Sequence, residues 1–169
     1  VLFGKKSLLM NMDPFHGGGG MVEIISEDKI LYREPPHKFE AGTPMIASII
    51  GLGRAIEFIN SIGFEKIKSH KEHLSMKFFD ALQDHVEFLT PLCRGTSILS
   101  FCPNGIHPLD LSVLLSLDNI CLRVGNMCAQ PLMNALGKSD ICRLSLGVYN
   151  TEADLTELVK SLKGLKQTT

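Results

Sequence analysis

The chain has 169 residues, of which 44% are hydrophobic and 21% are charged, and its formal net charge is -1 at pH 7. These values are typical of one globular domain with enough apolar residues for a packed core. Acidic and basic residues are interspersed, so no basic stripe predicts a nucleic-acid partner and no polybasic segment predicts a membrane surface. No apolar run approaches the ~20 residues that a membrane span requires.

The cysteines are odd in number and form no C-x-x-C pair: Cys93, Cys102, Cys121, Cys128 and Cys142. This pattern argues against a disulfide framework and against a thiolate zinc site, and we expect no metal. It predicts a reducing compartment, hence a cytoplasmic protein in which most cysteines act as small core hydrophobes.

The first part of the chain contains short elements separated by turn-forming residues. Val1–Gly4 is apolar and predicts a strand, and residues 5–12 suit one or two helical turns. Val22–Ile25 and Ile30–Tyr32 flank a turn-like SEDK and predict a hairpin. Residues 34–44 contain prolines that block regular structure, so we expect an irregular connector there.

Helical and strand patterns alternate in the rest of the chain, which predicts an α/β or α+β fold. Thr151 and Asp154 have the spacing of a capping box at the start of the last helix. His70 and His73 lie among charged residues, which favours a solvated helix face over a metal site. We expect helices after Pro44, after Gly63, and over Pro108–Leu117, Gln130–Leu136 and Thr151–Leu165, and strands over Val86–Leu89, Ser97–Phe101, Ile120–Val124 and Ile141–Val148.

Two domains follow from this division. Residues 61–169 have the elements of a self-contained small α/β domain. Residues 1–60 supply one strand, a glycine run, a hairpin and a linker to the long helix. These cannot enclose a core, so the first domain requires further chain or another subunit.

The stretch LRVGNMCAQPLM (122–133) contains the strongest candidate for chemistry. Cys128 follows an apolar strand pattern and directly precedes a predicted helix start. A helix N-terminus and nearby cations favour the thiolate, which is the reactive form of cysteine. A nucleophile is therefore one interpretation, and a loop cysteine without a role is the other.

Two arginines and one helix start are candidates for anion binding. Arg123 and Arg143 each lie in an apolar strand pattern, where a guanidinium requires a carboxylate or phosphate partner. An internal salt bridge would satisfy the same requirement. Gly42 and Thr43 precede the long helix and could hold an anion with backbone N–H groups and a hydroxyl, although an ordinary helix cap would use the same residues.

Several motifs together resemble one family of enzymes. FEAGTP (39–44), IIGLGRAIEFI (49–59), LRVGNMCAQPLM (122–133) and CRLSLGVYNT (142–151) occur in the order found in the cysteine desulfurase and selenocysteine lyase branch of the class V aminotransferases. HGGGGM (16–21) resembles the glycine hairpin of that branch. The block R-x-G-x-x-C-A-x-P-L-M resembles the variant with a short cysteine loop.

The resemblance implies the C-terminal portion of a fold-type I transferase that uses pyridoxal 5'-phosphate. By this match, Cys128 takes sulfur from L-cysteine as a persulfide and alanine is released, and selenocysteine is the other substrate of the branch. Arg143 grips the substrate carboxylate and Arg123 lines the site. Thr43 and Gly42 touch the cofactor phosphate of the partner subunit. A homodimer, a sulfur-acceptor protein and iron–sulfur cluster assembly are implied as well.

Some features depart from the family pattern. The family's cofactor lysine lies upstream of VLFG, so the Schiff-base residue is not in this chain and the chain alone should be inactive. Asn126 and Met127 replace two histidines that commonly precede the nucleophile, and Met45 replaces a common asparagine. Two alternatives therefore stay open: a non-catalytic remnant that acts as an interaction module, or another class V lyase or aminotransferase.

Overall fold

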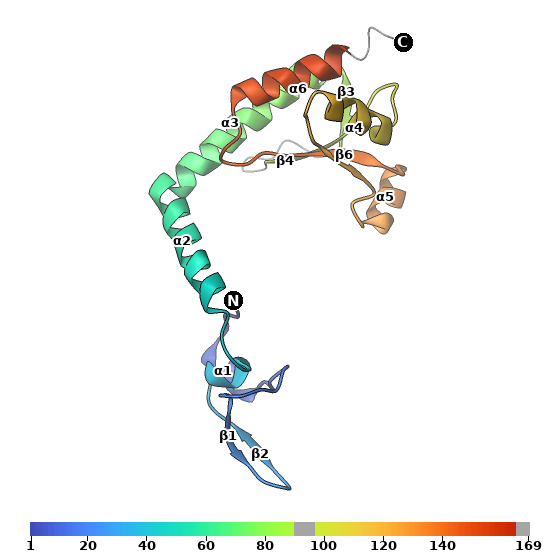
Figure 1. Cartoon of the computed structure of the whole chain (residues 1–169). Helices are drawn as coiled ribbons and strands as arrows, with labels where there is room; N and C mark the ends of the chain where they lie inside the picture. The colour runs from blue at the N-terminus through green and yellow to red at the C-terminus, as the bar shows by residue number, and fades with distance from the viewer. Residues whose placement is uncertain (90–96, 165–169) are drawn as a thin grey trace. The chain divides into compact units, whose positions relative to one another are not determined.

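The structure, a computed structural model, describes residues 1–89 and 97–164. The chain divides into two compact units, Val1–Phe58 and Ile59–Thr169. The first unit contains α1 (Lys6–Asn11), β1 (Val22–Ile25), β2 (Ile30–Tyr32), a 3-10 turn η1 (His37–Phe39) and most of α2 (Ile46–Ile62) (Figure 1).

The hairpin of the first unit is confirmed and its predicted first strand is wrong. β1 pairs antiparallel with β2, and Ile25 lies opposite Ile30 across the turn. Val1–Gly4 has no regular structure, since no other strand of the described residues pairs with it. An apolar run is extended in a sheet only when a neighbouring strand satisfies its backbone hydrogen bonds.

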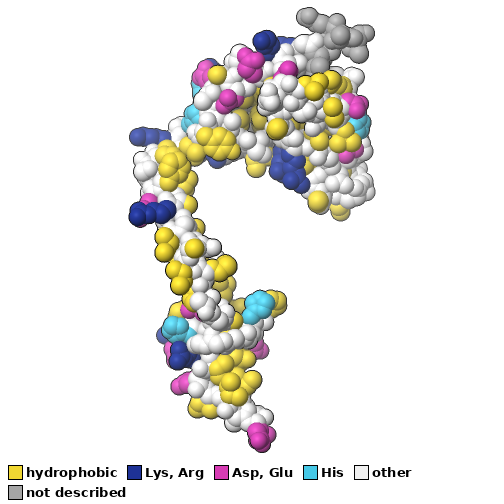
Figure 2. Space-filling model, in the orientation of Figure 1, with side chains coloured by type: hydrophobic (Ala, Val, Ile, Leu, Met, Phe, Trp, Pro, Cys, Tyr) yellow, Lys and Arg dark blue, Asp and Glu magenta, His cyan; other side chains and the backbone are white. Residues whose placement is uncertain are grey.

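The first unit has almost no core of its own. Among residues 1–58, all of which the structure describes, Met21 alone is buried. No residue of α2 is buried, and Ile46, Ile49 and Ile56 are 62%, 59% and 52% exposed. Figure 2 shows hydrophobic side chains gathered along this helix. The helix therefore presents an apolar surface that the described residues leave uncovered.

The second unit is a four-stranded antiparallel sheet with helices packed on it. The strand order is β3-β4-β6-β5, with β4 and β6 in the centre. Its elements are α3 (Phe64–Leu82), β3 (Val86–Phe88), β4 (Ile98–Pro103), α4 (Pro108–Leu117), β5 (Arg123–Gly125), α5 (Gln130–Leu136), β6 (Ile141–Ser145) and α6 (Glu152–Gly164).

One face of this sheet carries the hydrophobic core. Leu99 and Phe101 of β4 and Cys142 and Leu144 of β6 point to this face, as the period of two along a strand requires. Three helices supply the apolar residues that cover it, and the core contains Leu74, Phe78 and Leu82 of α3, Leu111 and Leu115 of α4, and Leu155, Leu158 and Leu162 of α6. The ring of Phe78 meets that of Phe88 edge-on, with centroids 5.9 Å apart.

The opposite face of the sheet bears the candidate site. Alternation along β6 places Arg143 on the face opposite Cys142 and Leu144. Ile141, on the same face as Arg143, is 4% exposed but lies outside the main core, as does Met133 of α5. Figure 1 shows α5 on the side of the sheet away from α3 and α6. The short helix therefore covers one end of this face.

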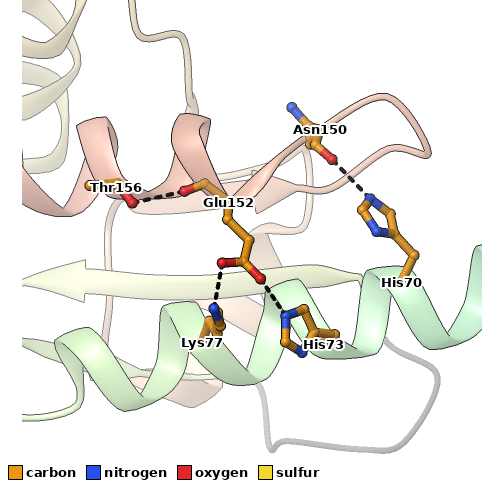
Figure 3. Close-up of polar contacts among 6 residues, drawn as sticks. All are labelled: His70, His73, Lys77, Asn150, Glu152 and Thr156. Carbon is orange, nitrogen blue, oxygen red and sulfur yellow. Dashed lines mark hydrogen bonds and ion pairs between the residues drawn. The ribbon is translucent and has the colours of Figure 1, made fainter.

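Polar contacts tie α3 to the start of α6 (Figure 3). The His73 Nε2 atom lies 2.7 Å from a Glu152 carboxylate oxygen, and the Lys77 ammonium donates to the other oxygen at 2.5 Å. The His70 Nε2 atom lies 2.8 Å from the backbone oxygen of Asn150. His73 is exposed, as the prediction of a solvated helix face requires, and these side chains in addition connect elements far apart in the sequence.

The remaining predictions differ from the structure mainly at element ends. β5 begins at Arg123 rather than Ile120, and β6 ends at Ser145 because a turn follows, in which Asn150 Oδ1 accepts from the Gly147 N–H at 2.8 Å. The capping box of α6 is confirmed: the Thr151 N–H donates to Asp154 Oδ2 at 2.8 Å. Leu165 and Cys93 lie outside the described residues.

Within residues 1–89 and 97–164, no single helix is long and apolar enough to cross a membrane. Only the bent pair of α2 and α3, taken together, reaches that length and composition.

Glu152→Gln should weaken the attachment of α6 to α3 and lower the midpoint of thermal unfolding at pH 7 by a few degrees. Hydrogen bonds from Lys77 and His73 lower the pKa of Glu152 from 4.5 to about 2. A carboxylate with a depressed pKa in the folded state stabilises the protein fully above its unfolded pKa, and this stabilisation is lost as the pH falls. The difference between wild type and variant should therefore be present at pH 7 and disappear between pH 4.5 and pH 2. A difference that persists at pH 2 would contradict this assignment.

Candidate functional site

The site begins with two arginines placed opposite each other by strand register. Arg123 of β5 and Arg143 of β6 are direct cross-strand partners in the antiparallel pair. Residues that face each other in this way project from the same side of the sheet, with Cβ atoms about 4.5–5.5 Å apart. Two guanidinium groups therefore share the face of the sheet opposite the main core.

Neither guanidinium is neutralised by the described part of the chain. The ion pairs among the described residues include neither Arg123 nor Arg143. The Nε atom of Arg143 is buried without a hydrogen-bond partner there. The internal salt bridge that would explain both arginines is thus not formed in the described residues. Like charges directly opposite each other destabilise a sheet, so this arrangement indicates a site for an anion.

The cysteine loop follows directly after β5. Gly125, at the end of the strand, has a φ of 115°, and Met127 and Cys128 have φ values of 56° and 57°. Left-handed backbone costs residues with a side chain about 1–2 kcal/mol each, so two in succession form a strained turn. The Cys128 side chain is exposed, and α5 begins at Gln130 with Ala129 as its N-cap residue. The loop therefore presents the thiol rather than packing it.

Cys128 differs from the described cysteines that were predicted to be structural. Cys142 is buried in the main core, and burial raises the pKa of its thiol to about 12. Burial also raises the pKa of the Cys102 thiol. Cys142 acts as a small core hydrophobe, as predicted, whereas Cys102 is half-buried and lies outside the main core. Cys121 is exposed, so it does not belong to the core cysteines. The described cysteines form no disulfide.

Gly42 and Thr43 lie in the first unit, where the glycine run packs against them. Gly42 has a φ of 79°, and its N–H donates to the Gly19 carbonyl at 2.9 Å. A Cβ atom on Gly18 would lie 3.0 Å from the Gly42 nitrogen, so this close approach requires glycine. The Gly42 N–H is thus already used, whereas the exposed Thr43 hydroxyl has no hydrogen bond within residues 1–89 and 97–164.

Other features of the described residues lie apart from this site. A cavity of about 460 Å³ between α6 and β6 is lined by Cys121, Leu144 and Asp154 among others, but by none of the predicted site residues. No group of three or more His, Cys, Asp or Glu side chains in the described part could hold a metal ion.

Sequence reasoning missed the role of Asn126, which it treated only as a replaced histidine. The Asn126 Oδ1 atom accepts a hydrogen bond from the Cys128 N–H at 3.0 Å. An asparagine two residues before a candidate nucleophile is a signal for such a turn, because its side chain commonly bonds the backbone two residues on.

The chain belongs to the class V aminotransferase family, whose model matches residues 1–158. The predicted family and the predicted fold class are therefore confirmed. Among curated relatives, the chain is 39% identical to a probable cysteine desulfurase of Staphylococcus epidermidis and 35% identical to one of Staphylococcus aureus. Each match covers 99% of this chain and 41% of the relative, so the chain spans about two-fifths of their length.

Solved structures of cysteine desulfurases share the fold of this chain. The cysteine desulfurase CsdA of Escherichia coli matches with a TM-score of 0.89 at 34% identity, over 98% of this chain and 42% of that one. The apo cysteine desulfurase of Thermococcus onnurineus matches with a TM-score of 0.92 at 31% identity and the same coverage.

Arg123→Thr should stabilise the protein in chloride by ~0.5 kcal/mol, because it removes the like-charge pair from the sheet. The same change should reduce the extra stabilisation that sulfate gives over chloride at equal ionic strength to the general salting-out effect. Thermal unfolding in both salts measures the two effects. Arg33→Thr, in the first unit, keeps the arginine pair and controls for the general salting-out effect of sulfate. Equal sulfate effects in the two variants would contradict anion binding by the pair.

Proposed function

We propose that the chain is part of a cysteine desulfurase, in which Cys128 takes sulfur from L-cysteine as a persulfide and L-alanine is released. One observation carries the proposal: two arginines that have no ion-pair partner among the described residues lie on one face of the sheet, and a loop that exposes a cysteine follows one of them in the chain. Family membership supports the reaction class. The desulfurase names of the relatives support the substrate.

Arg143 is the residue that we assign to the substrate carboxylate. Its buried Nε–H needs an acceptor, and a carboxylate meets the planar guanidinium with parallel hydrogen bonds. Arg123, opposite in register and more exposed, adds a second positive charge on the same face. Together they would orient the amino acid so that its sulfur faces the thiol.

At Cys128, the thiolate attacks the sulfur of the bound cysteine. A sulfur–sulfur bond forms and the carbon–sulfur bond of the substrate breaks, with its electron pair left on the carbon. That carbon takes up a proton and becomes the methyl group of alanine, while the enzyme keeps Cys–S–SH. An exposed thiol on a loop, rather than one in the core, suits this transfer and the later passage of sulfur to an acceptor.

Pyridoxal 5'-phosphate, when bound, supplies an electron sink for the carbons of the substrate. Within this chain the Thr43 hydroxyl fits a phosphate oxygen, because it is exposed and has no hydrogen bond among the described residues. The Gly42 N–H is not free to bind the phosphate, since it donates to the Gly19 carbonyl. Gly42 would contribute by its left-handed backbone conformation, which shapes the turn before Thr43. The lysine that forms the Schiff base is assigned to no residue of this chain.

The assembly and the cellular role belong to the same proposal. The apolar residues exposed along α2 support a homodimer and contact with further chain. Selenocysteine as a second substrate, a sulfur-acceptor protein and iron–sulfur cluster assembly follow from the family branch. A cytoplasmic location agrees with the free thiols of the described residues.

Cys128→Ala should abolish persulfide formation from L-cysteine in the protein expressed from its gene with all coding sequence upstream of Val1. The persulfide is located by mass spectrometry of peptides, and alanine release is measured in parallel. Cys121→Ala removes another exposed cysteine and should leave both readouts unchanged. Full alanine release by Cys128→Ala with L-cysteine would exclude this nucleophile and favour another class V lyase.

Arg143→Ala should raise the KM for L-cysteine by roughly 30- to 150-fold, the loss of about 2–3 kcal/mol of charge-assisted hydrogen bonding. Arg143→Lys should recover little of this loss, because an ammonium cannot form the bidentate contact. Steady-state kinetics of alanine release measure both variants. An unchanged KM in Arg143→Ala would show that the carboxylate is held elsewhere.

A further inference from the structure

We infer that Asn126 is a positioning residue for Cys128, held in turn by a row of amide side chains along α5. This inference rests on the proposed role of Cys128 as the nucleophile. Asn126 makes no contact with the sulfur in this account; it acts on the backbone that carries it.

The cysteine loop that follows β5 requires interactions that stabilise its backbone conformation. Asn119, Met127 and Cys128 are the described non-glycine residues with positive φ, and two of them adjoin in this loop. A side chain is strained in this backbone conformation, so the turn persists only if its surroundings hold it. An extended alternative would carry the thiol to a different place on the surface.

Asn126 accepts two hydrogen bonds within the loop, one with its side chain and one with its backbone carbonyl. Its Oδ1 atom accepts from the Cys128 N–H at 3.0 Å, and its backbone carbonyl accepts from the Ala129 N–H at 3.0 Å. The two bonds close the chain around Met127 and Cys128. The side chain of residue 126 therefore selects the left-handed turn over extended alternatives.

The amide of Asn126 is itself oriented by the first turns of α5. The Asn126 Nδ2 atom donates to Gln130 Oε1 at 3.3 Å, and Gln130 Nε2 donates to Asn134 Oδ1 at 2.9 Å. The spacing of four residues places Gln130 and Asn134 on one face of α5, and Asn126 joins them from the loop that precedes the helix. Because the Cys128 N–H requires an oxygen, only one orientation of each amide satisfies the whole row.

The test separates the hydrogen bond from the chemistry. Asn126→Ala removes the acceptor, Asn126→Ser restores a short neutral acceptor, and Gln130→Ala removes only the support. Amide hydrogen exchange at Cys128 should accelerate about fivefold in Asn126→Ala and less in the other two variants. Asn104→Ala, at an exposed asparagine after β4, is the matched control and should leave exchange unchanged.

The kinetic readout uses the protein expressed with all coding sequence upstream of Val1. Asn126→Ala should lower kcat for alanine release about tenfold with an unchanged KM for L-cysteine, and Asn126→Ser should recover most of it. Unchanged exchange at Cys128, or faster exchange with unchanged kcat, would overturn the inference. If the wild-type protein lacks desulfurase activity, the proposed function fails. The positioning of Cys128 is then tested by the rate at which iodoacetamide alkylates its thiol. This rate should change in Asn126→Ala and return to the wild-type value in Asn126→Ser, and an unchanged rate in Asn126→Ala would overturn the inference.

Discussion

The antiparallel pairing of β5 with β6 is the constraint on which the candidate site depends. This register places Arg123 opposite Arg143 on the face of the sheet that lacks the main core. It also fixes where β5 ends, and hence where the cysteine loop starts. A shift of β5 by one residue would turn Arg123 toward the apolar core, where an unpaired guanidinium is very costly. The apolar residues that alternate with the arginines therefore determine the position of the charges.

The two faces of the sheet differ: one carries the hydrophobic core and the other carries the candidate site. Helices α3, α4 and α6 cover one face with leucine and phenylalanine side chains, and Cys142 lies among them with a raised pKa. The contacts of Glu152 with His73 and Lys77 attach α6 to this layer. On the other face, two like charges oppose stability, and so does the left-handed turn that follows β5. Strain and unpaired charge of this kind are features of binding and catalytic sites.

Periodicity in the sequence was sufficient to predict most elements of the second unit. The limits of α4 and α5 follow from Pro108 and from Gly137, whose φ of 64° ends the helix. The apolar composition of Val1–Gly4 predicts a strand, but a strand forms only beside another strand that pairs with it. The composition of the segment does not reveal whether such a strand is present. The roles of His73 and Asn126 were missed for a similar reason. Glu152, the partner of His73, lies far along the chain. The hydrogen bond from the Cys128 N–H to Asn126 depends on the shape of the turn, which the residue types alone do not reveal.

The central claim is that the arginine pair on the open face of the sheet binds the carboxylate of an amino acid. Nuclear magnetic resonance of the arginine Nε–H groups, during titration with L-alanine, tests it most directly. The account predicts a selective downfield shift of the Arg143 Nε–H, with a smaller change at Arg123 and none at Arg33 or Arg54. Equal shifts at all four arginines, or no shift at Arg143 at saturating L-alanine, would contradict it.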